Sequence, residues 1–140
     1  AEGQVVKGGG AGMVKISPSL ENYLETVLVL EKDDPAVRLT DIANRLGVSK
    51  ASANRAQGLL KKAGLIEQER YGTITLTVKG RRAANDVYMR HRVIKEFLIK
   101  VLHINEETAE RDACRMEHVV SKETMARLAE YMGGMCDRRQ

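Results

Sequence analysis

The segment from residue 40 to residue 77 changes its hydrophobic period once, and this change constrains the fold more than any other feature. Two helices are predicted first, over Asp41–Leu46 and Lys50–Ala63, because each follows a capping residue and ends at a glycine. The period then becomes that of β-strands over Leu65–Glu69 and Thr73–Thr77, with a turn between them. Two helices joined by a tight turn and followed by a hairpin form a winged helix-turn-helix.

Helices are predicted on both sides of this segment, where capping residues mark their starts. The expected ranges are Ser19–Glu31 after Ser17 and Pro18, Lys79–Leu102, a helix after Asn105, and a last helix from Ser121 to about Gly133 and Gly134, with Thr40 and Ser49 as caps of the central pair. The fold class is therefore mainly α, with a winged helix-turn-helix domain over residues 17–78 and an all-helical domain over residues 79–140. Residues 1–16 are expected to form a flexible, glycine-rich tail.

The composition is that of an ordinary soluble globular protein. Hydrophobic residues make up 43% and charged residues 30% of the chain, which excludes a disordered or fibrous protein. No apolar run reaches the roughly 18 residues that span a bilayer, and a secretory signal is absent. Cys114 and Cys136 do not make a disulfide framework, and Cys136 has no evident partner. We therefore expect a cytoplasmic protein that does not bind a membrane.

Basic residues are concentrated in the middle of the chain. Residues 37–100 contain 14 Lys or Arg and 5 Asp or Glu, a net charge of +9, whereas the rest of the chain carries −5. A face that binds a polyanion would explain this asymmetry, and so would a solvated basic surface without a partner. The helix-turn-helix within this block favours the first explanation, with double-stranded operator DNA as the polyanion.

The second helix of the predicted pair carries side chains that can read DNA, because the exposed face of this helix enters the major groove in winged helix-turn-helix proteins. Hydroxyl groups and lysines suit phosphates, whereas asparagine and arginine can discriminate adenine or guanine. The predicted DNA-binding residues are Ser49, Lys50, Ser52, Asn54 and Arg55, with Arg70 and Tyr71 at the tip of the wing. A helical hairpin used only for protein contacts is the alternative.

Cys114, Glu117 and His118 are the residues of greatest chemical interest. On a single helix, positions i, i+3 and i+4 face the same side, so a thiolate, a carboxylate and an imidazole can converge there. This donor mixture suits a first-row transition metal. Asn22 and Glu25 add two oxygen donors, because they lie three residues apart and face away from the apolar stripe of the first predicted helix.

The same residues are also compatible with two other classes of function. A winged-helix regulator without a metal could sense a small ligand or the oxidation of Cys114, and a chelator would not change its DNA binding. A small metalloenzyme could use Glu117 as a base, but the sequence offers no second acid and no zinc-protease signature, so we expect no enzyme. Taken alone, His91 is best explained as a histidine bonded to phosphate or solvent.

Five stretches of the sequence resemble, in order and spacing, the diphtheria toxin repressor family of metal-dependent transcription regulators. They are SPSLENYLETVLVL, DIANRLGVSKAS, GLIEQERYGTITLTVKG, MRHRVIKEFL and DACRMEHVVS, within residues 17–131. The resemblance implies a homodimer with a winged helix-turn-helix DNA-binding domain and an all-helical dimerisation and metal-binding domain. It implies activation by Fe(II) or Mn(II) and repression of metal-uptake genes. The metal ligands that it implies are Asn22, Glu25, His91, Cys114, Glu117 and His118.

The residues at the implied ligand positions match neither branch of the family. Manganese regulators have acids at the positions of Asn22 and Cys114, and iron regulators have Met and Cys there. A thiolate favours Fe(II), Co(II), Ni(II) or Zn(II) over Mn(II), so iron is slightly preferred to manganese, and Co(II), Ni(II) and Zn(II) are expected to bind in vitro. The chain ends at Gln140, and its length resembles that of the short, two-domain manganese regulators.

Lys95 stands one helical turn after His91, where the family commonly has an acid. Either Glu96 or Glu110 substitutes for that acid, or a second metal position is weak or empty. A metal that joins the first helix to the later helices would fix the separation of two recognition helices in a dimer. The candidate residues for the dimer contact are Leu98, Val101, Leu102, Val119 and Val120, with an intramolecular core as the alternative.

Overall fold

The structure, a computed structural model, describes residues 5–7, 14–70 and 72–138. The elements in chain order are β1 (Val5–Lys7), β2 (Val14–Ile16), α1 (Pro18–Asp33), α2 (Leu39–Leu46), α3 (Lys50–Lys62), β3 (Ile66–Gln68), β4 (Ile74–Leu76), α4 (Val78–Lys100), α5 (Glu106–Met116) and α6 (Lys122–Arg138). The predicted mainly α fold is confirmed. The chain divides into two compact units within α4, between Asn85 and Asp86, whereas the sequence predicts a domain boundary after residue 78. Among the described residues, no helix combines the length and the apolarity that crossing a membrane requires.

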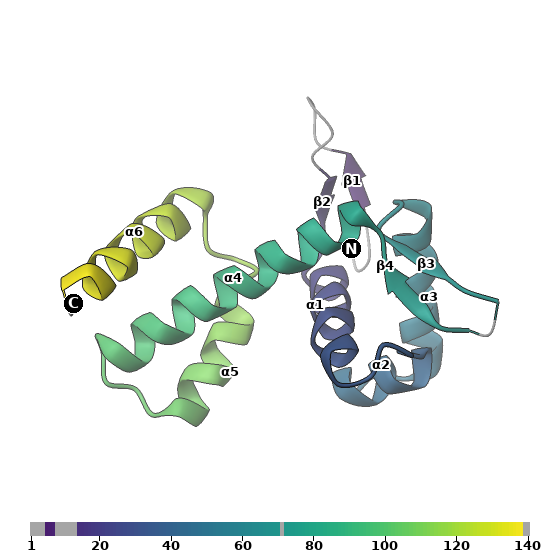
Figure 1. Ribbon diagram of the computed structural model, residues 1–140, viewed down its shortest axis with the longest axis horizontal. Helices are drawn as coiled ribbons and strands as arrows, with labels where there is room; N and C mark the ends of the chain where they lie inside the picture. Colours follow the sequence, from purple (N-terminus) through teal and green to yellow (C-terminus); the bar gives the residue numbers. More distant parts are fainter. Residues whose placement is uncertain (1–4, 8–13, 71, 139–140) are drawn as a thin grey trace. The chain divides into compact units, whose positions relative to one another are not determined.

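Helices α1, α2 and α3 form the core of the first unit (Figure 1). Ser17 caps α1, because its Oγ accepts a hydrogen bond from the backbone N–H of Leu20 at 3.4 Å. Apolar residues that recur at helical spacing point inward. The fully buried side chains include Leu20, Tyr23, Leu24 and Val27 from α1, Ile42 from α2, Leu60 from α3, and Leu65 and Ile74 from the segment that follows.

The turn between α2 and α3 has the predicted features. Gly47 adopts a left-handed backbone (φ +68°) at the end of α2, and Ser49 accepts a hydrogen bond from the N–H of Ser52 at 3.1 Å at the start of α3. The predicted cap of α2 is wrong, however, because α2 begins at Leu39 and not after Thr40.

The earlier start of α2 has a local cause. The carboxylate of Asp41 accepts a hydrogen bond from the backbone N–H of Arg38 at 3.0 Å, so Arg38 becomes the residue that flanks the helix. An acid in the first turn also interacts favourably with the helix dipole.

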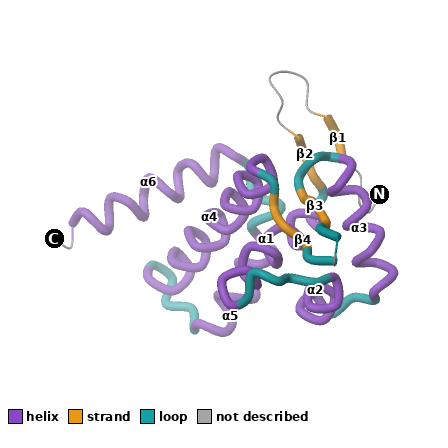
Figure 2. The backbone as a smooth tube through the Cα atoms, turned by 45° about the vertical axis from the view of Figure 1, so that its right-hand side comes forward, coloured by secondary structure: helices purple, strands orange, loops and turns teal. Residues whose placement is uncertain are grey.

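Strands β3 and β4 form the wing (Figure 2). They pair antiparallel, with Ile66 opposite Leu76. The N–H of Ile74 donates to the carbonyl oxygen of Val37 at 2.8 Å, and this bond attaches the wing to the connection between α1 and α2. The predicted winged helix-turn-helix is therefore confirmed.

The second unit contains the later part of α4 together with α5 and α6. Its core consists of Ile94 and Leu98 from α4, Ala109 and Ala113 from α5, and Met125 from α6. Of the residues predicted for a dimer contact, Leu98 lies in this core and Val120 packs against it, so both stabilise the protomer itself. Leu102 and Val119 are exposed by 52% and 77%, and both can contact a second copy.

The two ends of the chain differ from the predictions. The sequence predicts that the last helix ends near Gly133 and Gly134, but α6 continues to Arg138. Neither glycine has a positive φ, so the left-handed residue that would end the helix is missing there. Within the predicted flexible tail, β1 and β2 pair antiparallel through a valine-rich sequence that favours strands. Residues 1–4 and 8–13 of that tail lie outside the described residues.

Gly58 gives a prediction about the stability of the first unit. It lies exposed in the middle of α3, and a Cβ atom placed on it would meet no atom within 4 Å. Because glycine lowers helix stability relative to alanine, Gly58→Ala is expected to raise the free energy of unfolding by roughly 0.5–1 kcal/mol. Urea denaturation monitored by circular dichroism measures this change, and a decrease in stability would contradict the prediction.

Candidate metal centre

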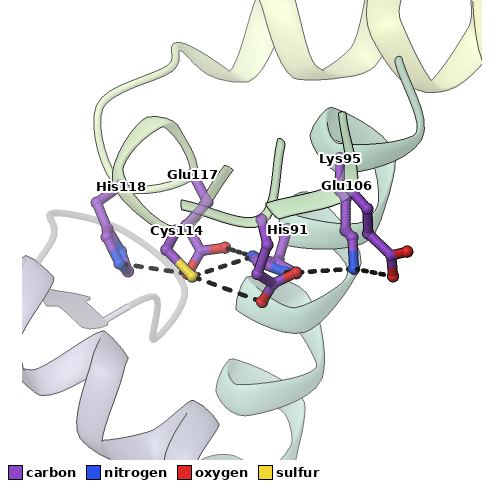
Figure 3. A network of polar contacts seen from close by, with 7 residues as sticks. His91, Lys95, Glu106, Cys114, Glu117 and His118 are labelled. Carbon is purple, nitrogen blue, oxygen red and sulfur yellow. Dashed lines mark hydrogen bonds and ion pairs between the residues drawn. The ribbon is translucent and has the colours of Figure 1, made fainter. Parts of the chain in front are cut away.

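The candidate metal centre is formed by residues of the second unit. His91 projects from α4, and Cys114 projects from α5 (Figure 3). Glu117 follows α5 as its C-cap residue and keeps a right-handed helical backbone. The sequence predicts Cys114, Glu117 and His118 on one helix, and this prediction is wrong, because α5 ends at Met116 and His118 lies in the turn beyond it.

One side of the His91 ring faces a carboxylate and a thiol. Nδ1 of His91 lies 2.8 Å from Oε2 of Glu117 and 3.8 Å from Sγ of Cys114. The side chain of Glu117 is completely buried, and that of His91 is 10% exposed. A nitrogen, an oxygen and a sulfur donor therefore converge in a place that excludes most solvent.

The other side of the ring faces a second carboxylate. Nε2 of His91 lies 3.0 Å from Oε2 of Glu110, and Nζ of Lys95 lies 2.9 Å from the same oxygen. Lys95 also lies 3.8 Å from Oε1 of Glu106. Glu96, the other acid considered as a substitute, lies 3.9 Å from Arg92 instead.

Glu117 has further partners in the same unit. Its Oε1 lies 3.3 Å from Nε2 of His118, whose side chain is 5% exposed. The backbone carbonyl of Glu117 accepts a hydrogen bond from Nη1 of Arg90 at 2.9 Å. Sequence patterns give no signal for this contact of Arg90, because any residue can supply the carbonyl group.

These contacts change the protonation of the centre. Hydrogen bonds with Cys114, Glu117 and Glu110 raise the pKa of His91 from 6.5 to about 11, against the opposing effect of burial. Burial raises the pKa of Glu110, but the contacts with Lys95 and His91 outweigh it, so the net shift of this pKa is downward. The hydrogen bond to Glu110 raises the pKa of Lys95.

The donor atoms fit a divalent transition metal. Ligand atoms of His91, Glu110 and Cys114 all lie within 4.8 Å of one another. Imidazole nitrogen, carboxylate oxygen and thiolate sulfur are ligands that first-row metals accept together. Of the six residues predicted as ligands, the structure brings together His91, Cys114, Glu117 and His118. Asn22 and Glu25 lie on α1 of the first unit, and their part in the centre stays a prediction.

Two family models cover most of the chain. The model of the iron-dependent repressor N-terminal DNA-binding domain matches residues 15–74. The model of the iron-dependent repressor metal-binding and dimerisation domain matches residues 77–136. In addition, the transcriptional regulator MntR of Escherichia coli is 36% identical over 106 residues, which are 76% of this chain and 68% of that protein.

The chain belongs to the diphtheria toxin repressor family. A regulator of Methanocaldococcus jannaschii, named as an uncharacterized HTH-type transcriptional regulator, is 32% identical over 124 residues, which are 88% of this chain and 99% of the relative. MntR of Geobacillus kaustophilus is 30% identical over 116 residues, which are 83% of this chain and 82% of the relative. These relatives are named transcriptional regulators, so the family is not one of enzymes.

Solved structures of the diphtheria toxin repressor family have the same fold. A manganese-dependent transcriptional repressor in complex with manganese is 31% identical, with a TM-score of 0.76. The IdeR protein of T. acidophilum is 29% identical, with a TM-score of 0.70. The alignments cover 81% of this chain in both cases, but only 52% and 53% of the solved chains. The chain thus spans about half the length of these two relatives.

The residues predicted to contact DNA lie on the family's DNA-binding domain. Ser49, Lys50, Ser52, Asn54 and Arg55 are exposed at the start of α3, and Arg70 is exposed at the turn of the wing. The two serines differ from the other residues, because Oγ of Ser49 donates to Oγ of Ser52 at 3.1 Å and also caps α3. Tyr71, the other predicted residue of the wing tip, lies outside the described residues.

Proposed function

We propose that this protein is a homodimeric repressor of metal-uptake genes in the cytoplasm, activated by Fe(II) or Mn(II). The convergence of His91, Cys114 and Glu117 carries this proposal, because it provides metal donors in the part of the chain that the metal-binding domain matches. The winged helix-turn-helix provides the surface that binds operator DNA.

The metal ligands in this proposal are Asn22, Glu25, His91, Cys114, Glu117 and His118. A bound divalent cation supplies the positive charge that would hold the donors of α1 together with those of the second unit. The thiolate of Cys114 favours Fe(II) over Mn(II), and it also permits Co(II), Ni(II) and Zn(II) in vitro.

The ligands control DNA binding by holding each DNA-binding domain in one position. In a two-fold symmetric dimer, two recognition helices must lie about 34 Å apart, or a multiple of this distance, to enter successive major grooves. Asn22 and Glu25 belong to the DNA-binding unit, so their coordination limits the spacings that the dimer samples. A coupling of roughly 1–3 kcal/mol would change DNA affinity about 5- to 150-fold.

A gel-shift experiment tests the proposed function. We expect Fe(II), Mn(II) or Co(II) to tighten binding to promoter DNA of metal-uptake genes by about 5- to 150-fold over the chelated protein. The variants Cys114→Ala and Glu117→Gln are expected to lose this stimulation, because each removes a donor. Glu130→Gln, which removes a carboxylate that is 75% exposed on α6, is the control and should keep it.

The same experiment separates the alternative function. A regulator that senses a small ligand or thiol oxidation would bind DNA equally well with and without a chelator. Metal-independent binding by the wild-type protein would therefore contradict the proposal.

A further inference from the structure

We propose that Lys95 and Glu110 act as a positioning pair that orients His91 to bind metal through Nδ1 and limits each protomer to one divalent cation. This inference rests on the proposed function, because it concerns the same metal centre. The ammonium group of Lys95 occupies the position beside Glu110 that a second cation would otherwise take.

The two nitrogens of His91 have different surroundings. Nδ1 faces the completely buried carboxylate of Glu117 and the sulfur of Cys114, at 2.8 Å and 3.8 Å. Nε2 faces Oε2 of Glu110 at 3.0 Å, and the other oxygen of this carboxylate, Oε1, lies 3.8 Å from the sulfur of Cys114. A cation that replaces the proton on Nδ1 gains the carboxylate and the thiolate as further ligands, so the Nδ1 side is the metal-binding side.

On the Nε2 side, His91 has the kind of carboxylate contact that supports a metal-bound histidine. Metal-bound histidines almost always donate the other ring N–H to a carboxylate, which fixes the tautomer and makes the ring a stronger ligand. Oε2 of Glu110 is placed to accept this hydrogen bond. The ammonium group of Lys95 lies 2.9 Å from the same oxygen, so the carboxylate of Glu110 is held in position.

A second cation has no suitable place on this side. Oε2 of Glu110 already contacts both Lys95 and His91, and any divalent ion bound there would lie beside the ammonium group and be repelled by it. Glu106 also lies near this ammonium group, at 3.8 Å. Lys95 therefore neutralises the acids that a second cation would need.

Metal stoichiometry tests the first part of the proposal. Isothermal titration of the full chain with Mn(II) and Co(II), checked by elemental analysis, is expected to give one ion per protomer for the wild type and for Lys95→Arg. Lys95→Glu, which exchanges the ammonium for a carboxylate, is expected to bind two. Lys100→Glu makes the same charge change at an exposed position of α4 and should bind one. Glu110→Gln is expected to weaken binding about 10- to 100-fold without changing the stoichiometry.

Nitrogen NMR tests the second part. In protein labelled with ¹⁵N-histidine and loaded with Zn(II), we expect His91 to show a metal-bound Nδ1 and a protonated Nε2. Coordination through Nε2 would overturn the proposal, as would two ions bound to the wild type or a single ion bound to folded Lys95→Glu. These three results would leave the proposed function intact. A wild-type protein that binds no ion would overturn the proposed function as well.

Discussion

Metal binding by this protein is expected to tighten at least about tenfold for each unit by which the pH rises through the neutral range. In the metal-free protein both ring nitrogens of His91 face carboxylates at hydrogen-bond distance, and the pKa of this histidine is raised to about 11. The ring is therefore protonated at neutral pH, and a cation must displace the proton on Nδ1. A higher pH lowers the proton concentration, so the competition shifts toward the metal.

Titration calorimetry with Mn(II) in buffers of different ionisation enthalpy measures both the affinity and the protons released. We expect at least one proton per bound ion. His103→Gln, which removes an exposed histidine outside the centre, is expected to leave the pH dependence unchanged. An affinity that is constant between about pH 6 and about pH 8 would rule out the displacement of a proton from His91.

The raised pKa of His91 has the opposite effect on the stability of the metal-free protein, which is expected to fall as the pH rises. Because folding raises the pKa of His91 above its ordinary value of 6.5, the contribution of its contacts to stability is fully present below that pH. It is lost as the pH rises toward about 11. Metal loading should therefore protect the protein most at alkaline pH.

The largest loss of stability is expected for Gly80→Ala, which should lower the free energy of unfolding by more than about 3 kcal/mol. Gly80 is buried near the start of α4, and a Cβ atom there would lie 1.7 Å from the carbonyl oxygen of Leu65. The obstacle is backbone, so no change of rotamer relieves it. The N–H of Thr77 donates to this same carbonyl at 3.1 Å, and Thr77 Oγ1 donates to the carbonyl of Gly64 at 2.7 Å, so both chain segments are held in place.

Urea denaturation of Gly80→Ala and Gly133→Ala measures this effect with a matched control. Gly133 also lies in a helix, but a Cβ atom there would meet no atom within 4 Å, so the same substitution should be tolerated. Equal stability of the two variants would show that α4 does not pack tightly on Leu65. Because Gly80 lies directly after the wing, we also expect Gly80→Ala to weaken DNA binding.

Local signals predicted the DNA-binding unit well. The caps Ser17 and Ser49 and the left-handed glycine Gly47 act over one turn of chain, so the sequence pattern is enough to place them. The differences are also local: the pattern predicts Thr40 as the cap of α2, whereas the carboxylate of Asp41 accepts a hydrogen bond from the N–H of Arg38. The pattern also predicts that α6 ends at Gly133 and Gly134, but both glycines are helical in the structure.

The metal centre could be predicted only in part. Residue type and spacing predicted Cys114 and Glu117 as metal donors, because thiolates and carboxylates close together on a chain are typical ligands, and the structure places both side chains beside His91. The resemblance, and not spacing, supplied His91. No sequence pattern predicts two further contacts, that of Lys95 with Glu110 and that of Arg90 with the carbonyl of Glu117. Each of them joins α4 to a distant segment of the chain.

The sequence by itself determined the order of the elements, the caps and glycines that separate them, and the kinds of donor atoms that the chain can offer a metal. These depend on interactions between residues a few positions apart. Only the tertiary structure decided which nitrogen of His91 faces the thiol, which acid Lys95 neutralises, and that Gly80 must be a glycine. Those outcomes depend on the packing of α4 against Leu65 and against α5, and distances between separate elements are not encoded in any local spacing.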